Sequence, residues 1–102
     1  AGAIRLVVEK MVNHALTRQV KILNPAGLHA RPSLAVAQIV RSSQSKVQIR
    51  TPWKTTIDAA DVLQLLSLGA SQGTELTLSA TGPDAEQVLD ALAQRFADQF
   101  DL

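Results

Sequence analysis

Apolar and polar residues alternate in four short segments of the chain, which predicts four β-strands. The predicted strands are residues 18–23, 46–50, 54–57 and 75–80. The clearest alternation is in the sequence KVQIR, where a glutamine separates Val47 from Ile49. Val20 and Ile22 alternate in the same way within the first segment. We therefore expect these aliphatic side chains to point to one side of a sheet.

Apolar residues at helical spacing predict three helices. The first has Pro32 in its first turn and runs to Arg41, and the third covers residues 85–100. The second is short: it starts at Asp58 or Asp61 as a capping residue, and Gly69 ends it. The core residues expected from the first and third helices are Val36, Ile39, Val40, Val88, Leu89, Leu92, Phe96 and Phe100.

The predicted elements follow the order strand, helix, strand, strand, helix, strand, helix. A chain of 102 residues has room for one core, but it is too small to cover both faces of a sheet with helices. An α+β fold, with the helices on one face of a mostly antiparallel sheet, satisfies both conditions. We expect residues 17–102 to form this domain.

The first 16 residues do not fit the pattern of the domain. They contain a short apolar stretch, and we interpret residues 1–16 as an N-terminal extension, a linker or residues contributed by a vector. His14 lies in this segment, and we expect it to be a solvated linker residue.

Composition and charge exclude several classes of protein. The chain has no cysteine, which rules out disulfides, a thiol nucleophile and thiolate metal sites. A formal net charge of +1 is a poor match for a nucleic-acid-binding protein that works through bulk charge. The longest segment without a charged residue, residues 62–74, is too short and too polar to cross a membrane. No secretory signal is recognisable, so we expect a cytoplasmic protein.

His29 stands where a turn containing Gly27 meets the start of the first helix. The N–H groups and the dipole at a helix start favour an anion, and Arg31 adds a forked donor that suits phosphate oxygens. A neutral imidazole beside such a site is suited to carrying a phosphoryl group. On spacing alone, an equally good interpretation is that His29 is an ordinary helix residue and Arg31 a solvated charge.

The residues around His29 resemble a known signature. The sequence NPAGLHARPS, residues 24–33, is similar to the active-site motif of HPr, the histidine-containing phosphocarrier family of the bacterial phosphoenolpyruvate:sugar phosphotransferase system. The segments LLSLG, GT and ATGPDA, at residues 65–69, 73–74 and 80–85, resemble later parts of the same family at the expected distances. The resemblance covers roughly residues 17–100.

This resemblance implies a fold and a site. The fold would be an open-faced β-sandwich, with a four-stranded antiparallel sheet and three helices packed on one face. His29 would accept a phosphoryl group on Nδ1 from phosphorylated enzyme I and pass it to an A-type domain of an enzyme II. Arg31 would stabilise the phosphate, and the backbone N–H groups of Ala30 and Arg31 would bind it. No metal or other cofactor is implied.

Partner proteins would dock on apolar surface near His29. The short second helix is apolar on all sides, which is unusual for a solvated element. We expect Leu65 and Leu68 to face the core. The candidates for docking are Leu34, Val62, Leu63 and Leu66. The alternatives are that the whole second helix is core and that Leu34 is a single exposed leucine.

One residue departs from the family pattern. Many HPr proteins have a serine at the start of the second helix, which a regulatory kinase phosphorylates, but here that position is Asp61. Asp61 is expected to cap the helix, and it also places a negative charge where the phosphoserine would be. A seryl-phosphorylation switch is therefore not expected.

Three functional settings are compatible with the motif. The first is a phosphocarrier for sugar uptake. The second is a regulatory HPr-like protein of the nitrogen-related branch, which uses its phosphorylation state to bind other proteins. The third is an HPr domain within a larger fused phosphotransfer protein.

Overall fold

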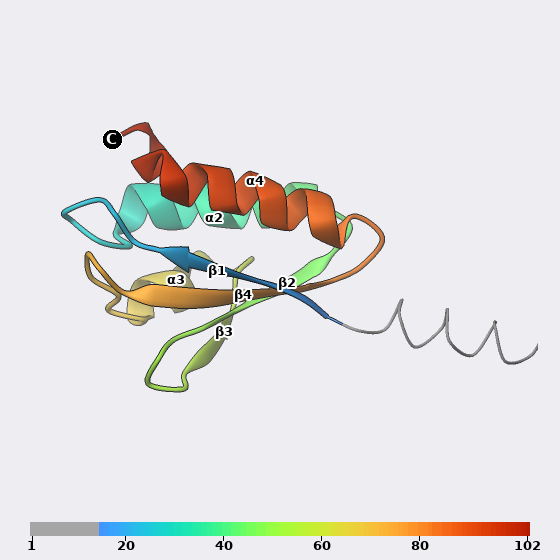
Figure 1. Cartoon of the computed structure of the whole chain (residues 1–102), viewed down its shortest axis with the longest axis horizontal. Coiled ribbons are helices and arrows are strands. Elements are labelled where there is room, and N and C mark those ends of the chain that lie inside the picture. The colour runs from blue at the N-terminus through green and yellow to red at the C-terminus, as the bar shows by residue number, and fades with distance from the viewer. Residues whose placement is uncertain (1–14) are drawn as a thin grey trace, which may run out of the picture.

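The computed structural model describes residues 15–102, which form one four-stranded antiparallel sheet and three α-helices (Figure 1). The strands are β1 (Leu16–Lys21), β2 (Lys46–Arg50), β3 (Thr56–Asp58) and β4 (Glu75–Thr81). The helices are α2 (Ala30–Ser42), α3 (Val62–Ser67) and α4 (Ala85–Ala97), and a 3₁₀ turn follows at Gln99–Asp101. The order along the chain is the one that the hydrophobic pattern predicts.

The strands lie in the order β1-β4-β2-β3, and every neighbouring pair is antiparallel. The last strand of the chain, β4, therefore lies between β1 and β2. Opposite Leu78 of β4 are Arg18 of β1 and Ile49 of β2. Because β1 and β4 pair along their length, main-chain hydrogen bonds join the first strand of the domain to the last one.

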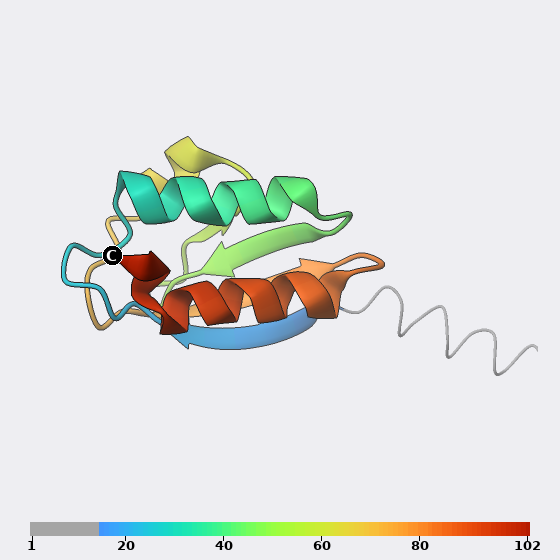
Figure 2. The same cartoon turned by 90° about the horizontal axis from the view of Figure 1, so that it is seen from above.

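The helices cover one face of the sheet. Figure 2 shows α2 and α4 side by side above the strands, with α3 beside α2. In residues 15–102 no helix covers the opposite face, which carries polar side chains such as Gln48 and Thr77. The predicted α+β, open-faced β-sandwich is confirmed.

The core lies between the sheet and the helices. The aliphatic residues predicted to point inward from the strands are all buried, and Val47 and Ile49 have no exposed surface. The predicted inward face of the third helix is buried as well: Val88, Leu89, Leu92, Phe96 and Phe100. Of the residues predicted from the first helix, Ile39 is only partly buried. Burial of this aliphatic set is the main contribution to the stability of the fold.

Three elements have bounds that differ by two residues or more from the sequence prediction. Strand β1 begins before residue 18 and ends at Lys21, although the side chain of Ile22 stays in the core. Strand β3 is displaced toward Asp58, because Lys54 adopts a positive φ of 68° and completes a turn by donating its N–H to the Thr51 carbonyl. The last helix stops at Ala97, and Phe100 reaches the core from the 3₁₀ turn.

Residues 1–14 lie outside the described part of the chain. The interpretation of residues 1–16 as an extension, and that of His14 as a linker residue, therefore remain predictions. Within residues 15–102, no helix is long and apolar enough to cross a membrane.

Candidate functional site

The loop between β1 and α2 reverses direction in a tight turn. The N–H of Gly27 donates to the carbonyl oxygen of Asn24 across 3.1 Å, and Gly27 has a positive φ of 71°. A Cβ atom on residue 27 would lie 2.6 Å from the carbonyl oxygen of Ala70. Only glycine satisfies both the backbone angle and this close approach.

A second loop, between α3 and β4, holds the first one in place. Leu28 donates its N–H to Ala70 O at 3.0 Å, and Gly73 donates to Ile22 O at 2.7 Å. The side chain of Gln72 donates to Leu23 O at 2.9 Å. Figure 1 shows the two loops side by side at one end of the molecule. The chain therefore enters α2 from a loop that main-chain bonds fix at several points.

His29 is the N-cap residue of α2. Its backbone is extended, with φ −88° and ψ −164°, and its carbonyl accepts the first helical hydrogen bond from the N–H of Ser33 at 3.0 Å. Its half-buried side chain makes no capping bond to the helix. Asn, Asp, Ser and Thr at this position usually satisfy the helix N–H groups. Because His29 does not, its imidazole is free for chemistry and the N–H groups are free for a ligand.

The start of α2 presents several unused donors. Within residues 15–102, no protein acceptor bonds the N–H groups of His29, Ala30 or Arg31. The first turn contains no acidic side chain, and Arg31 itself is exposed beside it. A helix of 13 residues adds the partial positive charge of its N-terminus. Binding of a phosphate beside His29 by the N–H groups of Ala30 and Arg31 stays a prediction.

The candidate docking residues occupy two neighbouring helices. Leu34 on α2 is 49% exposed, and Leu63 and Leu66 on α3 are 77% and 40% exposed. The expected inward pair, Leu65 and Leu68, is buried. Val62 is half-buried and packs against the core. The exposure of Leu34, Leu63 and Leu66 is confirmed, whereas docking on them stays a prediction.

Asp61, and not Asp58, caps α3. Its carboxylate accepts hydrogen bonds from the N–H of Leu63 at 3.0 Å and of Gln64 at 3.2 Å, and from the Gln64 side chain at 3.1 Å. The N–H of Gln64, then its side chain, lower the pKa of Asp61, and the charge of Arg41 acts in the same direction. The start of α3 is therefore occupied by a charged carboxylate of the protein itself.

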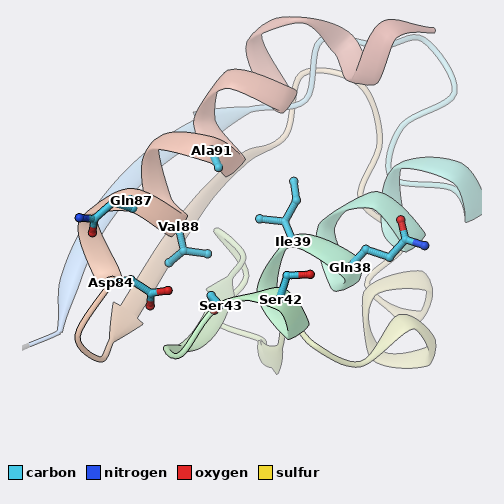
Figure 3. A pocket seen from close by; sticks show the side chains of 8 residues that line it. All are labelled: Gln38, Ile39, Ser42, Ser43, Asp84, Gln87, Val88 and Ala91. Carbon is cyan, nitrogen blue, oxygen red and sulfur yellow. The ribbon is translucent and has the colours of Figure 1, made fainter.

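A separate groove lies between the end of α2 and the start of α4 (Figure 3). It has a volume of about 390 Å³, with Ile39 and Val88 on its walls and Asp84 at one end. None of the residues predicted for the phosphate site or for docking lines it. The His29 site is thus an open surface site and does not coincide with this groove.

Sequence reasoning missed two parts of the site. It gave no indication that the side chain of Asn24 is buried within the loop that leads to His29. It also did not connect the segment around Ala70 with His29. Among residues 15–102, no group of three or more histidine, aspartate or glutamate side chains is placed to hold a metal ion.

A protein-family model described as the phosphorylation site of the HPr component of the phosphotransferase system matches residues 16–98 of the chain. The chain belongs to the HPr family. HPr proteins are phosphocarriers of the phosphotransferase system. The match contains the whole segment from Asn24 to Ser33 on which the resemblance was based.

Individual HPr-family relatives agree with this assignment. The phosphocarrier protein NPr of Escherichia coli K12 is 33% identical over 82 residues, which are 80% of this chain and 91% of the relative. The phosphocarrier protein HPr of Cupriavidus necator is 33% identical over 85 residues, or 83% and 94% of the two chains. The crystal structure of HPr-C-His from Thermoanaerobacter tengcongensis superposes with a TM-score of 0.81 at 30% identity, over 85% of this chain and 97% of that one.

Proposed function

We propose that this HPr-family chain carries a phosphoryl group on His29, which it takes from phosphorylated enzyme I and delivers to an A-type domain of an enzyme II. The observation that supports this most directly is the start of α2. There, an imidazole with no capping role adjoins three successive N–H groups that have no protein acceptor within residues 15–102. The proposal places the protein in the cytoplasm, where enzyme I draws on phosphoenolpyruvate.

In the first step the lone pair of neutral His29 attacks phosphorus through Nδ1. A new N–P bond forms, while the bond between phosphorus and enzyme I breaks and its electron pair stays with enzyme I. Phosphoryl transfer depends on positioning and on stabilising charge at the phosphoryl oxygens. The N–H groups of Ala30 and Arg31 and the guanidinium of Arg31 supply that stabilisation.

In the second step the N–P bond breaks, and the phosphoryl group passes from His29 to the A-type domain of an enzyme II. The phosphoryl group must be held long enough to reach the acceptor and must still leave quickly. One exposed arginine at the start of a helix meets this compromise, because solvent weakens its hold on the phosphate. Leu34, Leu63 and Leu66 give both partners an apolar surface on the helices next to His29, with a smaller contribution from Val62.

Sugar uptake is the first setting for this activity. A regulatory role in the nitrogen-related branch is the second, and Asp61 supports it, because a carboxylate occupies the position at which many family members have a phosphorylatable serine. Identity to the two kinds of relative is the same, 33% to the Escherichia coli NPr and 33% to the Cupriavidus necator HPr. An HPr domain of a fused phosphotransfer protein, with residues 1–16 as a linker, is a third setting.

The phosphorylation itself is tested by intact-protein mass after incubation with enzyme I, phosphoenolpyruvate and Mg²⁺. We expect the gain of one acid-labile phosphoryl group in the unaltered protein. His14→Ala, the matched control at the other histidine, should gain the group as well, and His29→Ala should not. A gain in His29→Ala, or no gain in the folded unaltered protein with enzymes I of both branches, would refute the proposal.

The branch is tested with the phosphorylated protein. It is mixed in turn with the A-type domain of a sugar enzyme II and with its nitrogen-branch counterpart, and the initial transfer rates are compared. A sugar carrier transfers faster to the first domain. A regulatory carrier transfers faster to the second.

A further inference from the structure

Asn24 begins the turn that leads from β1 to His29, yet only 2% of its surface is exposed. Asparagine in a surface turn normally points into water. Within residues 15–102, the only other buried polar residues are Ser33 and Thr51. Burial of an amide is unfavourable unless its polar atoms are bonded, so the contacts of this side chain need an explanation.

The side chain and the main chain of Asn24 close the same turn. Its Nδ2 donates to the carbonyl oxygen of Gly27 at 2.6 Å, and its own carbonyl accepts from the N–H of Gly27 at 3.1 Å. The N–H of Leu28 belongs to the same peptide group as the Gly27 carbonyl, and it donates to Ala70 O at 3.0 Å. In the next peptide group, the Leu28 carbonyl accepts from the Ser33 hydroxyl at 3.3 Å. The chain therefore reaches His29 through two consecutive peptide groups whose orientations are set by hydrogen bonds.

The other polar atom of the Asn24 amide has no such partner. Within the described residues, Oδ1 is buried and accepts no hydrogen bond. Buried acceptors without a donor are uncommon in native proteins, because the lost hydration is not replaced. The contact that this amide does make within the described residues is the donation from Nδ2 to Gly27 O at 2.6 Å.

Building on the proposed function, we propose that Asn24 is a positioning residue for phosphoryl transfer. Its amide orients the peptide group of Gly27, which in turn sets the direction in which His29 and the free N–H groups of α2 face the phosphoryl group. Transfer needs the attacking nitrogen close to phosphorus and in line with the leaving atom, and a displacement of about 1 Å costs about 100-fold in rate. Asn24 touches neither phosphate nor partner and acts only through this turn.

Two substitutions and one control test the role. Asn24→Asp has the same shape but turns an acceptor oxygen toward the Gly27 carbonyl. Asn24→Ala removes both the donor and the unpaired oxygen. Thr51→Val is the matched control: Thr51 is buried to the same extent and holds the β2–β3 turn by accepting from the N–H of Thr55 at 3.1 Å. It belongs to a different turn from the one that leads to His29.

Transfer from phosphorylated enzyme I is measured over a range of carrier concentrations, at a temperature where circular dichroism shows each variant folded. We expect kcat to fall by about 10- to 100-fold in both Asn24 variants, with KM changed less than about twofold because the docking leucines are untouched. Thr51→Val should keep the kcat of the unaltered protein even where it lowers the midpoint of unfolding. Unchanged kcat in Asn24→Ala would show a merely structural role and overturn the inference.

A measurement on the unaltered protein covers the case in which neither variant folds. The Asn24 side-chain N–H signals should shift in the ¹H–¹⁵N spectrum when the protein is phosphorylated, while those of Gln48 on the open sheet face should not. No shift at Asn24 would overturn the inference. If the unaltered protein accepts no phosphoryl group at all, the proposed function is wrong. Normal transfer by the Asn24 variants would instead overturn only the role of Asn24.

Discussion

Leu28 donates its main-chain N–H to the carbonyl oxygen of Ala70 across 3.0 Å. This bond joins the loop that precedes α2 to the loop that follows α3. The residue after Leu28 is His29, and α3 carries the exposed Leu63 and Leu66. The proposed phosphoryl acceptor and the proposed docking surface are therefore held in one fixed arrangement by the chain itself.

Gly27→Ala should destabilise the protein more than Gly69→Ala does. Both glycines have a positive φ, 71° and 62°, which costs an L-residue about 1–2 kcal/mol. Only at Gly27 would the new Cβ also overlap a backbone atom, 2.6 Å from Ala70 O, whereas nothing lies within 4 Å of a Cβ on Gly69. Urea unfolding measures the difference. Equal losses of unfolding free energy in the two variants would contradict the close approach of the two loops.

Arg31→Ala should slow transfer from enzyme I by about tenfold and leave the fold intact. The loss is no larger because an exposed guanidinium stabilises the phosphate less than a buried one does. The transfer rate of Arg31→Lys should lie between those of the unaltered protein and Arg31→Ala, since lysine keeps the charge but loses the forked geometry. Arg50→Ala, on β2 at the open sheet face, is the control and should transfer normally. Stopped-flow or quenched-flow rates provide the measurement. A normal rate for Arg31→Ala would remove Arg31 from its proposed role.

Leu63→Ala and Leu65→Ala separate docking from packing on the same helix. Leu63 is 77% exposed and Leu65 has no exposed surface. Leu63→Ala should raise the KM for enzyme I several-fold with little change in stability. Leu65→Ala should lower the free energy of unfolding by about 2–5 kcal/mol. Steady-state transfer and urea unfolding give the two quantities, and an unchanged KM for Leu63→Ala would count against docking at this surface.

Two hydrogen-bonded carboxylates, those of Asp61 and Asp84, predict how stability depends on pH. Hydrogen bonds from Gln64 lower the pKa of Asp61, and the Ser45 hydroxyl, followed by the N–H of Gln44, lowers that of Asp84. A lowered folded-state pKa favours the charged form, so this stabilisation is complete above the ordinary value of 3.8 and is lost as the pH falls through the folded pKa. Asp61→Asn should flatten the acid side of the stability curve from thermal unfolding at pH 2–5. An acid side identical to that of the unaltered protein would contradict the role of Asp61.

The layers of the fold were predictable from the chain alone. Val47 and Ile49 alternate with polar residues because one face of the sheet is buried and the other is not, and the pattern records that difference directly. Phe100 was correctly predicted as core, but the helix was not predicted to end before it. The order of the strands depends on pairing between residues as distant as Val20 and Leu76, for which the sequence carries no local signal.

The site was predictable only in part. The motif around His29 indicated the proposed acceptor and the unused donors beside it, because helix starts have the same unused donors in any fold. The burial of Asn24 was not predictable, since it depends on contacts that the turn makes after folding. Asp58 and Asp61 were equally good caps in the sequence, and only the hydrogen bonds to Leu63 and Gln64 distinguish them.

In the proposed function, a phosphoryl group on His29 is bound by the free N–H groups at the start of α2. The most direct measurement is the ¹H–¹⁵N spectrum of the protein before and after phosphorylation by enzyme I, together with the ¹⁵N shifts of the imidazole. We expect modification at Nδ1 of His29 and downfield shifts of the Ala30 and Arg31 amide protons that are larger than those elsewhere in α2. Phosphorylation of another residue, or Ala30 and Arg31 amide protons that do not move, would contradict it.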